Sequence, residues 1–379
     1  MPIRSIVNPS GPYSSTCGYC SPPGERTADR SSRHTASLSA LRLSCGVYQK
    51  MIDRGWRRSG TFCYKPDMRT TCCPQYTIRL DTTEFKASRS QRKLVNRWNR
   101  FVIAGHASEY LNSDSDGNAS KRKRTKDSSF SLCDSIHASE KGFIGETTTT
   151  LHAFETTIEP SSFTEEKYAL FRKYQMNIHN DSSTPSGFER FLVESPLLST
   201  TSHPHIDKEE PITYAPGAPS HLPRSYGSYH QLYRLDGKLV AVGVIDILPH
   251  CVSSVYFFYD DTWEEFSLGK LSALREISLV CEMRNASVPG MDFLYMGFYV
   301  HSCQKMRYKA QYSPSYLADP ETYDWYPISH CLPLLDKYKY ASFNRPNNSR
   351  SDPSYDGQGI LQAYTIKLLM TLGGLIQQK

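Results

Sequence analysis

The stretch from Tyr226 to Lys309 constrains the fold more than any other part of the chain. Two apolar segments flank Asp236-Gly237, and this dipeptide favours a two-residue hairpin turn because both residues tolerate a positive φ. The next segment, 253–259, is continuously apolar or aromatic, which is typical of a strand buried on both faces. The stretch therefore predicts a β-hairpin that leads into the core of a sheet.

The same stretch continues with one long helix and another buried strand. Apolar residues recur at three- and four-residue spacing over 268–283, which predicts a helix with one core face. The apolar segment 292–300 then closes a β-α-β unit. Upstream, we expect a strand at 148–158 and two helices, at about 164–178 and 187–194, that follow Ser-x-x-Glu capping patterns.

This element order matches that of a GNAT-like acyltransferase. We expect an α+β fold in which helices flank a mixed GNAT-like sheet and a small N-terminal cysteine-metal domain precedes it. Such a likeness concerns the fold and does not identify the chemistry. Composition divides the chain into four predicted regions: a cysteine-cluster and basic-helix domain (1–105), a disordered linker (106–147), the GNAT-like catalytic domain (148–344) and a tail of unknown role (345–379).

Cysteine usage and charge limit the class of protein. The 379 residues contain an odd number of cysteines, eleven, and no apolar leader precedes them, so we expect a reduced protein in the cytoplasm, with the nucleus as a second compartment. No run of eighteen uncharged apolar residues occurs, so we expect a soluble protein without a membrane partner. The net charge of +6 is too small to indicate a nucleic-acid partner by itself.

Four cysteines have the character of metal ligands. Cys17 and Cys20 are separated by two residues. At this spacing, two thiolates in a tight turn can bind one metal ion. Cys72 and Cys73 are adjacent, so both reach one site only through a turn, which Pro74 supports. The alternative is that these are ordinary buried or surface thiols. Four thiolates suit zinc and iron–sulfur clusters alike.

A basic helix is predicted over 86–101, where Leu94, Trp98 and Phe101 share one face. Cationic side chains along the other face can contact a phosphate backbone. The alternative interpretation is an ordinary solvated helix face. The basic residues are Arg89, Arg92, Lys93, Arg97 and Arg100.

Several of these segments resemble the arginyl-tRNA–protein transferases, which add arginine to protein N-termini. The resemblance is dense in LGKLSALREI (268–277) and YMGFYVHSCQKMRYKAQYSPSYL (295–317) and extends to about Asn344. A second group of similar segments lies near the N-terminus: CGYC, the CC that precedes QYTIRL, and SRSQRKLVNRWNR. The resemblance implies that the basic helix contacts tRNA, that arginyl-tRNA is the co-substrate, and that no nucleotide cofactor is used. It also implies an iron–sulfur cluster or zinc on Cys17, Cys20, Cys72 and Cys73.

The resemblance also implies a reaction. The α-amine of a protein that begins with Asp or Glu, and by extension oxidised Cys, attacks the ester carbonyl of arginyl-tRNA and so creates an N-degron for ubiquitin-dependent degradation. The ester is already activated, so the enzyme needs positioning, a path for the amine proton and donors for the oxyanion. It also needs cations for the acceptor carboxylate and an acidic wall for the guanidinium.

Candidate residues for these tasks lie at strand ends and on the long helix. His301 directly follows a predicted strand and can take the amine proton, with Tyr299 beside it. Asp246 and Glu276 are candidates for the guanidinium, although each can equally be a structural salt bridge or cap. The catalytic candidates are His301, Tyr299 and Asp246, and the substrate-binding candidates are Lys305, Arg307, Lys309, Gly269, Lys270, Ser272, Arg275 and Glu276.

Two other functions are compatible with the same elements. One is an acetyl-CoA-dependent GNAT N-acetyltransferase, but the segment 266–270 has a single glycine where a pyrophosphate loop needs several. The other is a non-catalytic, metal-dependent RNA-binding or redox-sensing protein built on residues 1–105.

Overall fold

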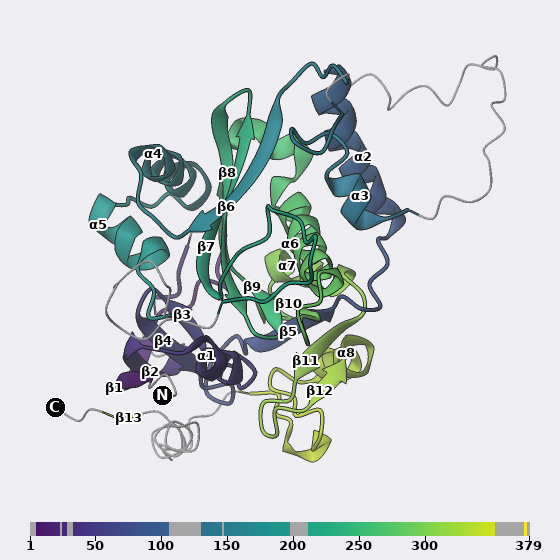
Figure 1. Ribbon diagram of the computed structural model, residues 1–379. Helices are drawn as coiled ribbons and strands as arrows, with labels where there is room; N and C mark the ends of the chain where they lie inside the picture. The colour runs from purple at the N-terminus through teal and green to yellow at the C-terminus, as the bar shows by residue number, and fades with distance from the viewer. Residues whose placement is uncertain are drawn as a thin grey trace.

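The computed structural model describes residues 5–22, 25–28, 33–105, 130–145, 148–197, 211–352 and 375–376. These residues form two β-sheets with helices packed around them (Figure 1). The larger sheet has eight strands in the order β12-β11-β5-β10-β9-β8-β7-β6. The smaller sheet has five in the order β13-β1-β2-β4-β3. The expected α+β fold with a mixed sheet flanked by helices is confirmed, whereas its GNAT-like character stays a prediction.

The eight-stranded sheet is antiparallel except where β9 and β10 pair in parallel. The helix α6 (Leu268–Asn285) connects these two strands, which confirms the predicted β-α-β unit. The strands are β5 (Tyr76–Asp81), β6 (Phe154–Pro160), β7 (Gly227–Leu235), β8 (Lys238–Leu248), β9 (Cys251–Tyr259), β10 (Phe293–Tyr299), β11 (Ser315–Ala318) and β12 (Trp325–Pro327).

The hairpin between β7 and β8 turns at the predicted dipeptide. Asp236 and Gly237 have φ values of 51° and 78°, the left-handed conformations that a two-residue turn of this kind requires. Nearly every residue of β8 is buried, because helices cover both faces of the sheet. Figure 1 shows α4 and α5 on one side of these strands and α6 with α2 and α3 on the other.

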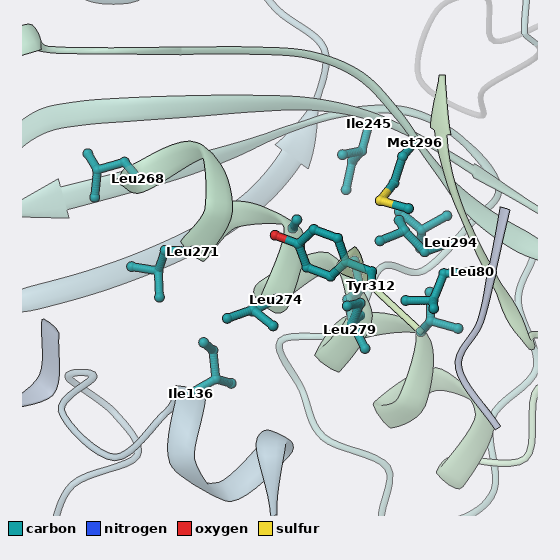
Figure 2. Close-up of a cluster of buried hydrophobic side chains, with 14 of the residues drawn as sticks. Leu80, Ile136, Ile245, Leu268, Leu271, Leu274, Leu279, Leu294, Met296 and Tyr312 are labelled. Carbon is teal, nitrogen blue, oxygen red and sulfur yellow. The ribbon is translucent and has the colours of Figure 1, made fainter. Parts of the chain in front are cut away.

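The helix α6 is buried on most of its surface, so the prediction of a single core face is wrong. Leu271 and Leu274 pack with Ile136 and Tyr312 in the main core (Figure 2). The polar residues in the middle of α6, Ser272, Arg275, Glu276 and Ser278, are buried as well, because α3 and the segment 211–225 cover the part of the helix that the sheet leaves free. These four side chains therefore face cavities instead of open solvent.

The five-stranded sheet packs against the large sheet through α1 (Cys45–Ile52) and a shared apolar cluster. Arg58 of the small sheet also pairs with Asp246 of β8, with Nε and Oδ2 2.9 Å apart. Since both side chains are buried, this ion pair fixes how the two sheets meet. The strands are β1 (Ile6–Ser15), β2 (Arg33–Arg42), β3 (Arg57–Ser59), β4 (Phe62–Pro66) and β13 (Leu375–Ile376).

The N-terminal segment also contributes to the large sheet. The strand β5 pairs with β10 and β11, and α2 (Arg89–Ala104) packs on α6. Of the predicted linker, residues 106–129 and 146–147 lie outside the described residues, whereas 130–145 contain the short helix α3 (Leu132–Ile136). The tail is described only as far as residue 352 and at β13. The division into four regions stays a prediction.

Several helix ends differ from those predicted. The helix α2 begins at Arg89, because Ser88 and Gln91 form a capping box, and ends at Gly105, which has a φ of 74°. The predicted serine caps at 162 and 186 are wrong: Thr164 and Thr184 accept the capping hydrogen bonds. The other helical segments are α4 (Glu165–Tyr174), η1 (Gln175–His179), α5 (Pro185–Phe188), η2 (Glu189–Val193), η3 (Asp261–Phe266), α7 (Gln304–Arg307), η4 (Tyr308–Gln311), α8 (Ile328–Lys337) and η5 (Pro346–Asn348).

Among the described helices, none combines the length and the apolar character that crossing a bilayer requires.

Candidate active site and metal centre

The largest described cavity, of about 790 Å³, lies where the two sheets meet. Its walls come from β9, β10, the first half of α6, the segment 305–309 and the small sheet. We call it the central cavity. Tyrosine and phenylalanine rings form much of its lining, including Tyr64, Tyr256 and Tyr308. An aromatic cleft with a few buried charges is typical of a ligand site.

One end of the central cavity carries a buried carboxyl group, that of Glu276 on α6. Only 2% of Glu276 is exposed, and its Oε1 accepts hydrogen bonds from the hydroxyls of Ser272 (3.1 Å) and Ser254 (3.4 Å). No cation among the described residues pairs with it. Burial raises the pKa of Glu276 to about 7, and the two hydroxyls offset only part of that effect.

The cavity also contains two buried cations, Arg57 and Lys309. Arg57 Nη2 donates to the carbonyl of Gly297 at 2.9 Å, and Lys309 Nζ donates to the carbonyl of Phe298 at 2.7 Å. The two groups therefore converge on consecutive carbonyls of β10, and no carboxylate in the described part of the chain pairs with either. Burial, and then the charge of Arg57, lower the pKa of Lys309 to about 7. The arrangement suits a small anion.

The first turn of α6 opens toward the same cavity. Ser267 precedes the helix in a left-handed conformation, with a φ of 50°, and its side chain caps no backbone N–H. Gly269 lines the cavity, where a side chain would contact the ring of Phe257. Lys270 is exposed and does not line it. The predicted residues that the cavity brings together are Gly269, Ser272, Glu276, Lys305 and Lys309.

Two predicted residues are buried in ion pairs outside the central cavity. Asp246 pairs with Arg58 and accepts a hydrogen bond from the Ser228 hydroxyl at 2.7 Å. Arg275 extends from the opposite side of α6, where its Nη1 is 2.8 Å from Glu140 Oε2. Each of the two is held in a buried ion pair, which is the structural alternative considered for Asp246.

His301 lines a separate hollow of about 220 Å³ near the end of α8, and Tyr299 lies beside it. The Tyr299 hydroxyl is 3.0 Å from His301 Nδ1, and His301 Nε2 is 2.8 Å from Asp336 Oδ1. Arg307 donates from Nε to the carbonyl of His301 at 2.8 Å. These three predicted residues form one network that does not line the central cavity.

The four predicted cysteine ligands lie together, with all sulfur atoms within 4.8 Å of one another. Cys20 Sγ is 3.7 Å from Cys72 Sγ, and the backbone N–H of Tyr19 donates to Cys17 Sγ at 3.4 Å. A hydrogen bond from Cys73 lowers the pKa of Cys17, so a thiolate is favoured in this cluster. In a tetrahedral zinc site, thiolates at about 2.3 Å from the ion are separated by about 3.8 Å. The residues therefore fit a metal ion.

The cysteine cluster is next to the central cavity. Tyr19 and Met306 pack against the cluster and also line the cavity. The peptide that carries Cys17 and Cys20 and the helix α7 are therefore held between the two sites. A bound ion would fix one wall of the cavity.

The basic residues of α2 differ in their surroundings. Arg89, Arg92, Lys93 and Arg100 are exposed. Arg97 instead donates from Nη2 to the carbonyl of Glu265 at 2.6 Å, which ties α2 to η3. Four of the five candidate tRNA contacts thus remain accessible to a phosphate backbone.

Sequence reasoning missed Arg57. It lies in the run Arg57-Arg58 after Trp56, which gives no signal of burial because adjacent arginines are usually exposed. Its place in the cavity follows from the packing of β3 near β10, a contact between residues 240 positions apart.

Two family models match the chain. The model described as the N terminus of arginine-tRNA-protein transferase matches residues 15–93, and that of the C terminus matches residues 166–319. These ranges include the cysteine cluster, the first five residues of α2 and, apart from Tyr13, the walls of the central cavity.

Curated relatives extend the match over most of the chain. Arginyl-tRNA–protein transferase 1 of Drosophila melanogaster is 33% identical, over 98% of this chain and 91% of its own length. Arginyl-tRNA–protein transferase 1 of Arabidopsis thaliana is 29% identical, over 89% and 75% respectively. The aspartate/glutamate leucyltransferase of Chromobacterium violaceum is 26% identical, over 80% and 87%. On these matches, the chain belongs to the arginyl-tRNA–protein transferase family.

Proposed function

We propose that the chain transfers arginine from arginyl-tRNA to the α-amine of proteins that begin with Asp or Glu. Arginine transfer follows from the family and from the names of its relatives. Acidic acceptors are supported by the name of the bacterial leucyltransferase relatives and by the paired cations Arg57 and Lys309. Oxidised cysteine, which is also an anion, is a further acceptor on the same grounds.

The chemistry needs no covalent intermediate on the enzyme. The neutral α-amine attacks the ester carbonyl, a C–N bond forms, and the ester C–O bond breaks. The proton lost by nitrogen balances the ribose oxygen that leaves as a hydroxyl. An α-amine has a pKa of about 7.7–8.0, so a substantial fraction is neutral near pH 7.5. The enzyme must then position the two reactants and exclude water.

Glu276 recognises the guanidinium of the donor arginine. It is the one residue of the described cavity wall that offers a buried carboxyl group without a cation partner. An arriving guanidinium supplies the missing charge and favours the ionised carboxylate over the neutral form that burial favours. The proposed specificity for arginyl-tRNA as the donor depends on this buried carboxyl group without a cation partner.

Arg57 and Lys309 recognise the side-chain carboxylate of the acceptor. Their donor groups converge on the carbonyls of residues 297 and 298, so one carboxylate can contact both. Lys305 lies on the same wall and is positioned for the 3′ end of the tRNA. Exposed basic residues of α2 extend this positive surface toward the tRNA body. Proton transfer by His301, with Tyr299 and Asp246, stays an untested prediction, and no step here depends on it.

Cys17, Cys20, Cys72 and Cys73 hold a single ion, for which zinc is the favoured candidate. An iron–sulfur cluster places several atoms between its thiolates, whereas the sulfur atoms here are nearly in mutual contact. The bound ion links the segment that contains Cys17 and Cys20 to the segment that contains Cys72 and Cys73. The cytoplasm is the expected location, with the nucleus as a second one, and arginylated products would enter ubiquitin-dependent degradation.

The decisive experiment compares donors and acceptors with purified protein. Labelled arginine from arginyl-tRNA should transfer to Asp- and Glu-starting peptides and much less to Asn-, Gln- or Ala-starting ones, and RNase should abolish transfer. Glu276→Gln should lower kcat/KM for arginyl-tRNA by roughly 10- to 100-fold, the value of a hydrogen bond to a charged group. With leucyl-tRNA as donor, the variant should lose far less.

Glu264→Gln is the matched control, because Glu264 is exposed on η3 and does not line the cavity. Equal loss for both donors in Glu276→Gln would contradict guanidinium recognition. Consumption of acetyl-CoA without any arginine transfer would contradict the whole proposal.

A further inference from the structure

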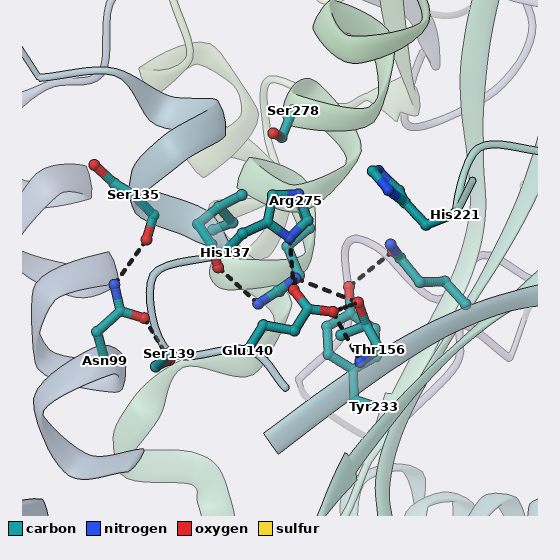
Figure 3. A network of polar contacts seen from close by, with 12 residues as sticks. Asn99, Ser135, His137, Ser139, Glu140, Thr156, His221, Tyr233, Arg275 and Ser278 are labelled. Carbon is teal, nitrogen blue, oxygen red and sulfur yellow. Dashed lines mark hydrogen bonds and ion pairs between the residues drawn. The ribbon is translucent and has the colours of Figure 1, made fainter. Parts of the chain in front are cut away.

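A second cavity lies on the opposite side of α6 from Glu276. Its volume is about 420 Å³, and it is enclosed by α3, β6, β7 and the segment 220–225. Figure 3 shows the polar residues around it, with Glu140 and Arg275 at the centre. None of the residues that line this cavity lines the central cavity. The proposed transfer reaction therefore leaves this cavity unexplained.

Three metal-ligating side chains meet in this cavity. His137 Nε2 is 3.1 Å from Glu282 Oε1, and His221 Nε2 is 2.6 Å from Glu282 Oε2. Ligand atoms of all three residues lie within 4.8 Å of one another. Their side chains are 15%, 31% and 11% exposed, so the group is sheltered but reachable from solvent. In a tetrahedral zinc site with bonds of about 2.0–2.1 Å, ligand atoms are about 3.3 Å apart.

The surroundings orient His137 as a ligand. Its Nδ1 is 2.6 Å from Glu140 Oε2, and Glu140 is paired with Arg275, with both side chains buried. The Glu140 carboxylate can only accept, so Nδ1 of His137 carries the hydrogen, and in the neutral tautomer of the ring the Nε2 lone pair is directed at Glu282. A carboxylate that orients a histidine through its other ring nitrogen is the usual outer support of a metal ligand.

This orientation leaves two acceptors facing each other. The lone pair of His137 Nε2 points at Oε1 of Glu282, and two acceptors at 3.1 Å repel unless a cation lies between them. His221 approaches the other oxygen of the same carboxylate. The hydroxyl of Ser278 donates to Glu282 Oε1 and holds the carboxylate in place. The geometry therefore requires either a proton or a metal ion at this point.

From this geometry, we infer that His137, His221 and Glu282 form a second metal site that binds a divalent first-row ion, zinc above all. Two imidazoles and one carboxylate are a ligand set that zinc accepts, with a fourth position open to the cavity for water or a small anion. The site is separate from the cysteine cluster in position and in ligand type.

The ion would join three parts of the chain. His137 follows α3, His221 lies in the segment 211–225, and Glu282 is in the last turns of α6. The first two segments come directly after residues 106–129 and 198–210. Binding at this site therefore holds both segments on the central helix, and it stabilises the folded protein by an amount that grows with the logarithm of the free zinc concentration above the dissociation constant.

The test is a metal-binding measurement on the full chain. Protein stripped of metal under reducing conditions is equilibrated with buffered Zn²⁺ and its zinc content is measured. Wild type should bind one equivalent more than His221→Asn and one more than Glu282→Gln. His330→Asn is the matched control, because His330 is exposed and outside the cluster, and it should bind as wild type does. Equal zinc content in all four proteins would mean that only a proton is shared, and would overturn the site.

A second measurement needs no variant. Co²⁺ bound by the cysteine cluster gives thiolate charge-transfer absorption, whereas Co²⁺ bound by imidazole and carboxylate gives ligand-field bands alone. Titration of wild type should show both kinds of site. If every bound equivalent of Co²⁺ adds thiolate absorption, the inferred site does not exist.

Discussion

Glu276 and Lys309 line the same cavity, and burial opposes the charge of each. The carboxyl favours its neutral form and the amine is half deprotonated near pH 7, although both are hydrogen-bonded. Groups shifted toward neutrality by desolvation are common in binding sites, because a ligand of opposite charge restores the ionised form. As pH rises through about 7, the Glu276 carboxyl gains its charge whereas the Lys309 amine loses its charge.

The Glu276 carboxyl should lower stability at neutral pH. Its pKa is about 7 in the folded protein, against an ordinary value of 4.5 for a glutamate side chain. Between these values the folded state holds a proton that the unfolded state has released, so stability falls as pH rises through this window. Glu276→Gln should remove the loss and be more stable than wild type by up to about 3 kcal/mol at pH 8, with little gain at pH 4. Denaturant midpoints at both pH values measure this, and an equal effect at the two would contradict it. Glu264→Gln should show no such difference.

Lys309 should limit acceptor recognition at high pH. Its amine loses the proton as pH rises through about 7, so preference for an Asp-starting over an Asn-starting peptide should decline above that pH. The two peptides share the same α-amine, so their kcat/KM ratio isolates recognition of the carboxylate. Lys309→Arg keeps its charge and should retain the preference up to pH 9. A ratio that declines identically in both proteins would exclude Lys309 from this function.

Several candidate residues on α6 and in the segment 305–309 line the central cavity, whereas the candidates Tyr299 and His301 do not. Ser272 and Glu276 are four residues apart on α6, so they lie on one face of the helix, and both line the cavity. Along β10, however, the register with β5 shifts between Tyr295 and Phe298, where Gly297 has a φ of 66°. This bulge breaks the alternation of side chains, so the direction of the residues that follow cannot be predicted from spacing alone.

At the scale of elements, the sequence predicted the bounds of helices and strands better than it predicted which elements pack side by side. The helix expected at 268–283 occupies 268–285, and the strand expected at 292–300 forms β10 at 293–299. Which elements cover the polar side of α6, and which sheet β5 joins, depend on contacts between residues that are far apart in the chain. Local periodicity carries no information about such pairings.

The helix α2 should contribute salt-dependent affinity for tRNA. Arg92 and Lys93 are exposed, and each phosphate contact that is lost lowers the slope of log K against log salt concentration by about one. Replacing both by alanine should weaken tRNA binding and reduce the slope by about two. A control that removes Lys50 and Lys141, exposed on other elements, loses the same charge and should change the slope far less. Equal slopes for the two double variants would indicate that only net charge matters.

At the scale of the whole molecule, the cysteine cluster and the central cavity are connected by side chains that contact both. Tyr19 lies between two of the cysteines, and Met306 lies on α7, and both side chains contact the two sites. Val300, at the end of β10, packs against Cys17 and Cys73. If the cluster holds an ion, its loss should release the segment around Tyr19 and the start of α7 together, because both contact the cluster and both belong to the cavity wall.

Removing one ligand should consequently reduce catalysis without affecting the substrate contacts themselves. Cys20→Ser removes an exposed sulfur ligand, so its direct cost in packing is small, and the variant should lose bound metal. A displacement of the cavity wall by about 1 Å costs roughly 100-fold in rate. We expect kcat/KM for arginine transfer to fall by that order. Cys303→Ser is the matched control, because Cys303 packs against the cluster without being one of its four sulfur atoms. This control should retain metal and activity. If Cys20→Ser loses the metal yet transfers arginine at the wild-type rate, the cluster does not support the cavity, and the two sites act independently.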